Sequence, residues 1–153
     1  AVQSTLDIDA KSKKKALFTR LVSFDPASGK TAMYGYPIDS AAYSKNSDAK
    51  IGDIVALDMP NGDVYVKRVI AVAGDTVNID REKIYVNGEE VTTPQAVGKT
   101  EAKSDKITYP LTVEDKQVFV LGDNREVSRD SREIGTVKIK NIKGKIRWSI
   151  GIF

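Results

Sequence analysis

Hydrophobic and polar residues alternate with a period of two along much of the chain, the pattern of β-strands with one buried face. The clearest run is VYVKRVIAV at residues 64–72, which follows GDIVALDMP and the turn-forming sequence Asn61–Asp63. These two runs predict a β-hairpin. Counting in twos places four residues on one face of its second strand: Tyr65, Lys67, Val69 and Ala71.

Shorter runs bounded by turn residues predict the remaining strands. They are ALFTRLVSF (16–24), TAMYGY (31–36), GDTVNID (74–80), KIYVNGEEV (83–91) and Val118–Leu121, with one or two more in the tail from Val137. Trp148 and Phe153 of the tail are candidate core or interface anchors. No segment has the period of an amphipathic helix. We therefore predict a nearly all-β, mainly antiparallel fold, with short strands closing into a small barrel-like arrangement.

The polar stretches set the predicted domain limits. Residues 1–15 are polar and lysine-rich and predict a flexible or edge-lying arm, so residues 16–153 form the domain proper. Residues 37–50 predict a loop around a short strand. Residues 92–108 are polar and aperiodic, which indicates a surface loop that is either solvated or in contact with a partner.

Composition narrows the possible chemistry. The chain has 153 residues, of which 41% are hydrophobic and 29% charged, as expected for one globular domain. It has no cysteine and no histidine, which excludes disulfides, thiolate catalysis, a Ser-His-Asp triad and imidazole metal sites. Hydrolytic chemistry would have to use Ser, Lys, Asp or Glu.

The net charge of +3 is concentrated in KSKKK at residues 11–15. Such a run is either a solvated tail or a contact for anionic lipid headgroups. No run of 18 apolar residues predicts a membrane span. Because the sequence starts at Ala1 without Met, we expect a preceding segment, which could include a membrane anchor.

Lys67 is the first candidate functional residue. Apolar neighbours on its strand face would disfavour the ammonium form and lower the pKa of Lys67 from about 10.4. A lysine that is neutral at working pH can act as a general base. The alternative is that Lys67 extends its amine to water from a strand edge.

The second informative segment is GDNREVSRDSREIG at residues 122–135, where Asp130 and Arg132 can pair and Ser128 can form hydrogen bonds. By itself it could be a well-capped structural turn. Together with GDIV and with KR followed by GD, in this order, it resembles the bacterial type I signal peptidases of the short Gram-positive type. The resemblance covers Ile51 to Ile146.

The resemblance implies roles for individual residues. Lys67 matches the general base of a Ser-Lys dyad, and Ser128 matches the serine that orients this lysine. Asp130 and Arg132 match a salt-bridged pair that supports the site, and Asp123 lies in the same support.

The candidate nucleophile lies outside these motifs. The family motif SMxPT is absent, and the nearest sequence is SFDPA, which makes Ser23 the candidate unless this segment is only a hairpin turn. Ala32, which precedes Met33, could instead mark a site whose serine is replaced. Ser4 and Ser44 are weaker candidates because they have neither the proline nor a clear preceding strand.

The function implied by the resemblance is that of a membrane-associated serine endopeptidase that cleaves signal peptides of exported preproteins at the extracytoplasmic face of the cell membrane. The substrate would dock as an added β-strand, and no metal, organic cofactor or nucleic acid is implied. The alternative is a catalytically inactive signal peptidase-like assembly factor for surface proteins or pili. Self-cleaving repressors also use a Ser-Lys dyad, but the sequence contains no DNA-binding region.

Overall fold

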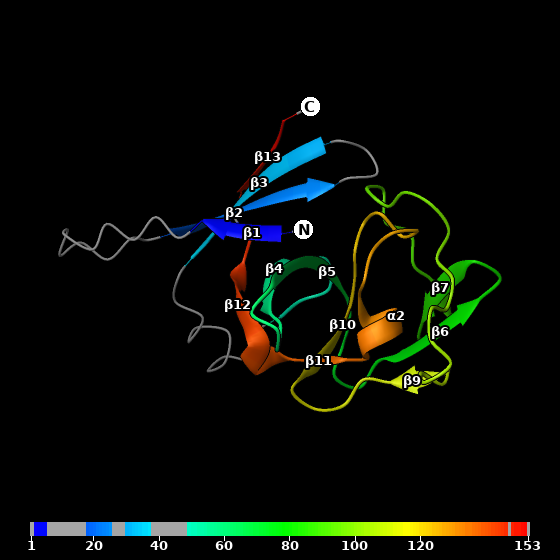
Figure 1. The fold of residues 1–153 in the computed structure, drawn as a ribbon. Helices are drawn as coiled ribbons and strands as arrows, with labels where there is room; N and C mark the ends of the chain where they lie inside the picture. Colours follow the sequence, from blue (N-terminus) through cyan, green and yellow to red (C-terminus); the bar gives the residue numbers. More distant parts are fainter. Residues whose placement is uncertain (1, 6–17, 26–29, 38–48, 147, 153) are drawn as a thin grey trace.

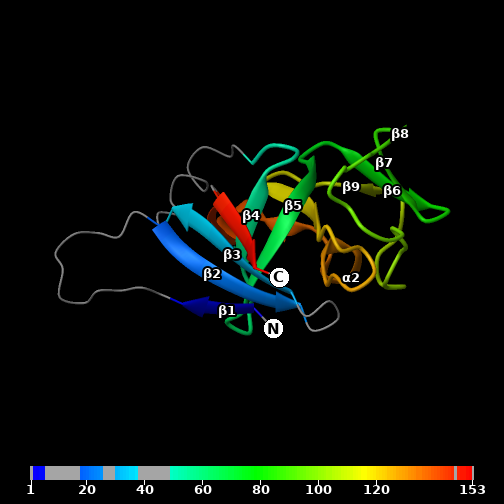
Figure 2. The same cartoon turned by 90° about the horizontal axis from the view of Figure 1, so that it is seen from above.

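A computed structural model describes the backbone of residues 2–5, 18–25, 30–37, 49–146 and 148–152, and the side chains of residues 49–146. The described strands form three antiparallel sheets (Figures 1 and 2). The N-terminal sheet has the order β1-β2-β3-β13. Its strands are β1 (Val2–Thr5), β2 (Phe18–Asp25), β3 (Lys30–Pro37) and β13 (Trp148–Ile152).

The central sheet has the order β11-β10-β5-β4-β12. Its strands are β4 (Ile54–Asp58), β5 (Val64–Val72), β10 (Gln117–Leu121), β11 (Val137–Lys138) and β12 (Ile142–Lys145). The predicted hairpin is confirmed, since β4 and β5 pair around a turn in which Gly62 has φ 87°. That angle suits glycine, which has no Cβ to clash.

The small sheet has the order β8-β7-β6-β9 and lies beyond β10, on the side away from the N-terminal sheet (Figure 1). Its strands are β6 (Thr76–Asp80), β7 (Lys83–Val86), β8 (Glu89–Glu90) and β9 (Leu111–Thr112). On the other side, β1 contacts β5 and β3 contacts β12, so the N-terminal sheet lies against the central one (Figure 2).

The apolar residues of the central sheet are buried on both of its faces. Val55 and Leu57 pack with β10 and the segment after it, whereas Ala56 and Val64 pack with Ile146 on the opposite face. A third cluster joins the central sheet to the small one. β5 is therefore an interior strand, and a polar residue on it must find a partner inside the protein.

One part of the pattern prediction for β5 is wrong. Val69 packs in one core cluster, whereas Ala71 packs with Ile70 in another. β10 pairs Phe119 with Ala71 and Val120 with Val69, so Ile70 is an extra residue in β5. This β-bulge shifts the alternation by one residue, and Ala71 leaves the face predicted for it.

The prediction of a mainly antiparallel all-β fold is confirmed. The helices in the described part are α2 (Ser131–Ile134) and the 3-10 turn η1 (Ile139–Asn141). Each is about one turn long, too short for a helical period to show in the sequence. The predictions for the lysine run at 11–15 and the loop at 38–48, and for the side chains of Trp148 and Phe153, lie outside the described part of the chain.

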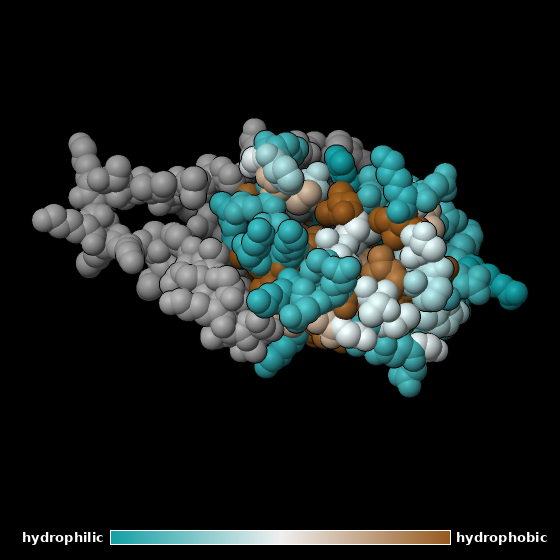
Figure 3. Space-filling view, turned by 90° about the horizontal axis from the view of Figure 1, so that it is seen from below, coloured by the Kyte–Doolittle hydropathy of each residue, from teal (hydrophilic) through white to brown (hydrophobic). Residues whose placement is uncertain are grey.

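The surface of the described part mixes polar and apolar side chains. Ile51, Val97 and Val127 are large apolar residues that remain exposed within residues 49–146. On the face shown in Figure 3, brown residues lie among white and teal ones without forming one continuous apolar patch. Among the helices in the described residues, none has the length and apolar character needed to cross a bilayer.

Candidate active site

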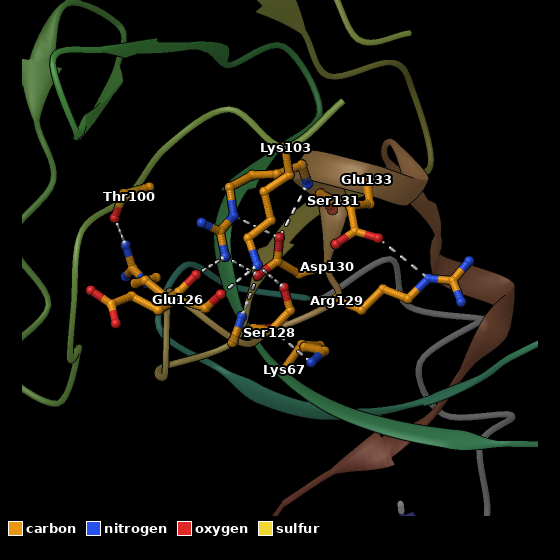
Figure 4. A network of polar contacts seen from close by, with 12 residues as sticks. Lys67, Thr100, Lys103, Glu126, Ser128, Arg129, Asp130, Ser131 and Glu133 are labelled. Carbon is orange, nitrogen blue, oxygen red and sulfur yellow. Dashed lines mark hydrogen bonds and ion pairs between the residues drawn. The ribbon is translucent and has the colours of Figure 1, made fainter. Parts of the chain in front are cut away.

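The candidate site is centred on a hydrogen bond between β5 and the segment that follows β10. The amine of Lys67 donates to Oγ of Ser128 at 2.9 Å (Figure 4). The topology explains why these residues meet. β10 runs antiparallel to β5 and ends with Leu121 paired to Arg68, so the chain leaves the sheet beside Lys67.

Gly122 makes this close approach possible. A Cβ at position 122 would lie 2.0 Å from Oγ and 2.4 Å from Cβ of Ser128, and 3.4 Å from Nζ of Lys67. The serine thus packs directly over the glycine backbone. Any larger residue at 122 would displace the serine from the lysine.

The environment of Lys67 favours its neutral form. Burial is the largest influence and lowers the pKa of Lys67, while the negative charge of Asp130 opposes this effect. The positive charges of Arg132 and Lys103 lower the pKa further, and Glu133 raises it. The ring of Tyr65, with its centroid 5.2 Å from Nζ, attracts the ammonium form and so acts against the lowering of the pKa.

The net result is a lowered pKa, so the predicted direction is confirmed. Lys67 pairs with Val55, which is fully buried, and its amine is bound to Ser128. The alternative of a lysine that extends into water from a strand edge does not fit a residue on an interior strand.

The predicted pairing of Asp130 with Arg132 is confirmed, and both side chains are 0% exposed. Arg132 donates from Nε to Oδ1 at 2.9 Å and from Nη2 to Oδ2 at 2.8 Å. The carboxylate also accepts from the N–H of Gly122 at 3.0 Å and caps α2 through the N–H of Arg132. Asp130 thereby ties the end of β10 to the segment carrying Ser128.

Burial by itself raises the pKa of the Asp130 carboxyl, but the hydrogen bonds and charge of Arg132 outweigh it, and the pKa falls. Neighbouring Ser131 is also fully buried, and its Oγ accepts from the N–H of Val120 at 2.9 Å. The segment 130–132 is therefore a rigid support, with each buried polar group bound to a named partner.

Asp123 binds a different partner. Its carboxylate accepts from Nε and Nη2 of Arg68, both at 2.9 Å. This bidentate pair raises the pKa of Arg68, chiefly through the hydrogen bond. Arg68 is the second residue of the KR pair, and the sequence pattern alone indicated no role for it.

The loop at 92–108 contacts the site and is not merely a solvated connection. Thr100 Oγ1 accepts from buried Arg125 at 2.7 Å, and the carbonyl of Glu101 accepts from Arg132 at 3.3 Å. Lys103 donates to the carbonyl of Ser128 at 2.7 Å. Aperiodic polar sequence contains no signal for such contacts, because the partners lie about 25 residues further along the chain.

Ser23 lies in β2, where it pairs with Ala32 of β3 and with Val2 of β1. Two of the positions considered for a nucleophile, 23 and 32, are thus cross-strand partners in one sheet. Ser4 lies in β1, paired with Leu21, and Ser44 lies outside the described residues. Side chains of this sheet are not described, so the assignment of Ser23 stays a prediction.

The site holds the amine of Lys67 in a fixed orientation and lowers its pKa. Both properties suit a general base, which must accept a proton. Within the described residues, no group of three or more acidic side chains could hold a metal ion. A lysine of lowered pKa held against a serine hydroxyl is an arrangement that a hydrolase using an amine as its base would need.

Comparison with known proteins agrees with this class. The family model described as "Signal peptidase, peptidase S26" matches residues 6–150, and the chain belongs to this family. The predicted family resemblance is confirmed. The signal peptidase I of Bacillus amyloliquefaciens is 43% identical over 109 residues, which is 67% of this chain and 58% of that protein.

Two further relatives give the same result. Signal peptidase IB of Staphylococcus aureus strain Mu50 is 35% identical over 118 residues, which is 68% of this chain and 62% of that protein. The crystal structure of a signal peptidase I from Enterococcus faecalis V583 has a TM-score of 0.52 at 34% identity, covering 63% of this chain and 94% of that chain. The chain spans less than two thirds of the length of the curated relatives it matches.

Proposed function

We propose that this chain is the catalytic domain of a membrane-associated serine endopeptidase that cleaves signal peptides from exported proteins. The observation that carries the proposal is the Lys67–Ser128 hydrogen bond, together with the lowered pKa of the lysine. Membership of the signal peptidase family and relatives named signal peptidase I support the same function.

The proposed reaction is acyl transfer. Oγ of Ser23 attacks the scissile carbonyl carbon, and neutral Lys67 takes the hydroxyl proton. Backbone N–H groups near the serine hold the oxyanion, and Lys67 then gives the proton to the departing amine. Water cleaves the resulting ester on Ser23, with Lys67 acting as base again, and the serine is regenerated.

The described part of the chain supplies the base and its support. Ser128 orients the amine of Lys67 through its acceptor oxygen. The buried Asp130–Arg132 pair holds the segment that carries this serine. Such a supporting layer matters because a base displaced by about 1 Å can lose about a hundredfold in rate.

The proposed substrate is an extended peptide with small residues near the scissile bond, docked as an added strand. The proposed location is the extracytoplasmic face of the cell membrane, reached through an anchor in a preceding segment. The run at Lys13–Lys15 would then bind anionic vesicles weakly and in a salt-sensitive way. Equal binding to neutral and anionic vesicles would contradict this part of the proposal.

The test is cleavage of a synthetic signal-peptide substrate by the whole chain and five variants, one of them a control. Lys67→Ala, Lys67→Arg and Ser23→Ala should each reduce kcat/KM by about a thousandfold or more, and the double alanine variant should be little worse. Ser4→Ala, in the same sheet as Ser23, should cleave normally and is the control.

Other outcomes would point to a different nucleophile or to a function without cleavage. Normal cleavage by Ser23→Ala together with loss in Lys67→Ala would show that another serine is the nucleophile. If the unmodified chain cleaves nothing, Ala32→Ser tests whether the cross-strand position restores a lost nucleophile. A chain that still binds an exported protein without cleaving it would support the assembly-factor alternative.

A further inference from the structure

Lys103 is the one residue of the loop at 92–108 whose charged group bonds directly to the segment holding Ser128, among the contacts described. Its amine donates to the carbonyl of Ser128 at 2.7 Å and to that of Glu126 at 3.1 Å (Figure 4). Thr100 and Glu101 attach the same loop to arginines of this segment. The loop therefore places Lys103 at a defined position.

Ser128 is consequently held at both of its oxygens by lysines. Lys67 binds Oγ from β5, and Lys103 binds the carbonyl oxygen from the loop. The N–H of Ser128 donates to the carbonyl of Asn124 at 3.0 Å. With its backbone restrained on both sides, the serine presents its Oγ to Lys67 in one direction.

The charge of Lys103 matters as well as its hydrogen bonds. The charged groups around Lys67 are Asp130, Arg132, Lys103 and Glu133. Arg132 forms an ion pair with Asp130, so their opposite charges act on Lys67 in opposite directions. Lys103 instead donates to neutral carbonyls and has no ion-pair partner among the described residues. Its positive charge therefore acts on Lys67 without a counter-charge of its own.

We propose that Lys103 is a positioning residue of the Lys67 site, which fixes the backbone of Ser128 and keeps a positive charge beside the catalytic amine. The effect on cleavage rests on the proposed function, whereas the effect on the titration of Lys67 does not. The lowering of the pKa of Lys67 by Lys103 supports this role, because like charges disfavour the ammonium form.

The experiment compares Lys103→Met, Lys103→Gln and Lys103→Arg with Lys106→Met, which removes the same charge from an exposed position of the same loop. The first readout is the reactivity of the Lys67 amine toward acetic anhydride at a series of pH values, followed by peptide mass spectrometry of the whole chain. The second is the pH profile of kcat/KM on a signal-peptide substrate.

Lys103→Met should move the titration of Lys67 to higher pH, and the acid limb of kcat/KM should move with it. On the acid limb this lowers kcat/KM by about three- to tenfold, and the loss shrinks as the pH is raised. Lys103→Arg should restore both profiles, and Lys106→Met should leave them unchanged. Lys103→Gln keeps a donor without the charge and should shift the titration as Met does, so it tests the charge even if the Met variant does not fold.

An unchanged Lys67 titration in Lys103→Met and Lys103→Gln would overturn the inference, as would an equal shift in Lys106→Met. A pH-independent loss in Lys103→Met that Lys103→Arg does not rescue would also overturn it, since a merely structural role gives that result. One further outcome is that the unmodified chain cleaves nothing while the titration of Lys67 still shifts in Lys103→Met and Lys103→Gln. In that case the proposed function fails and the inference stands.

Discussion

Oγ of Ser128 accepts a hydrogen bond from Nζ of Lys67 at 2.9 Å, although the two residues are 61 positions apart in the sequence. Lys67 stands on an interior strand, and Ser128 follows the neighbouring strand after a sharp departure at Gly122. The bond fixes the direction of an amine whose lowered pKa suits a general base.

Ser128→Ala should leave the fold intact and reduce kcat/KM by about a hundredfold, because Lys67 loses the acceptor that orients its amine. KM should change little, since the serine acts on the base and not on ground-state binding. Steady-state kinetics on a signal-peptide substrate measure both values. Ser104→Ala, in the surface loop, is the matched control, and an unchanged kcat/KM in Ser128→Ala would argue against an orienting role.

Activity should rise with pH as Lys67 deprotonates. Burial lowers the pKa of this lysine below its ordinary value of 10.5, so the acid limb of kcat/KM should have its midpoint below that value. Below the midpoint the amine carries a proton and cannot accept another. The measurement is kcat/KM across the alkaline range. An activity that falls with rising pH over this limb would contradict the assignment of Lys67 as base.

Gly122→Ala should lose nearly all activity. The new Cβ would lie 2.0 Å from Oγ of Ser128, so the serine must move away from Lys67. Gly74→Ala serves as control, because its φ of 91° disfavours alanine while no atom lies within 4 Å of the added Cβ. The control should cost about 1 kcal/mol of stability with normal activity. Equal activity in both variants would show that the close approach at 122 is unimportant.

Breaking the buried ion pair should destabilise the fold. Arg132→Met leaves the Asp130 carboxylate buried without its main partner, and the expected cost is about 3–5 kcal/mol in the free energy of unfolding. Asp130→Asn with Arg132→Met should cost less than the sum of the two single variants, because the residues act as a pair. Denaturant unfolding of the three variants measures this coupling, and strict additivity would contradict it.

The same pair predicts how stability depends on pH. The pKa of Asp130 is lower in the folded chain than in the unfolded one, where it is about 3.9. The carboxylate therefore contributes stability above that value, and the contribution is lost as the pH falls through the folded pKa. Asp130→Asn should flatten this part of the acid unfolding curve. If stability falls as steeply with acid in Asp130→Asn as in the wild type, groups other than Asp130 cause the acid sensitivity.

Local features of the fold could be predicted from the amino-acid pattern. A strand over Val64–Val72, a hairpin at Asn61–Asp63 and the pairing of Asp130 with Arg132 follow from period-two alternation, turn residues and opposite charges close together. Each of these features depends on residues within a few positions of one another, where sequence and structure are directly linked. The burial of Lys67 is not among them, because the alternation allowed both a lowered pKa and an amine extended to water. The interior position of β5 in its sheet decided for the lowered pKa.

Contacts between distant segments could not be predicted in this way, because they depend on how the strands and loops pack together. The bulge at Ile70 arises from the pairing of β5 with β10 and moves Ala71 off the predicted face. The contact of Lys103 with the carbonyl of Ser128 arises because a loop without periodicity passes over the segment after β10. Alternation along one strand contains no information about the register of its neighbour or the path of a loop. Strand register and loop path depend on packing across the whole domain. The same packing brings together the residues that support Lys67.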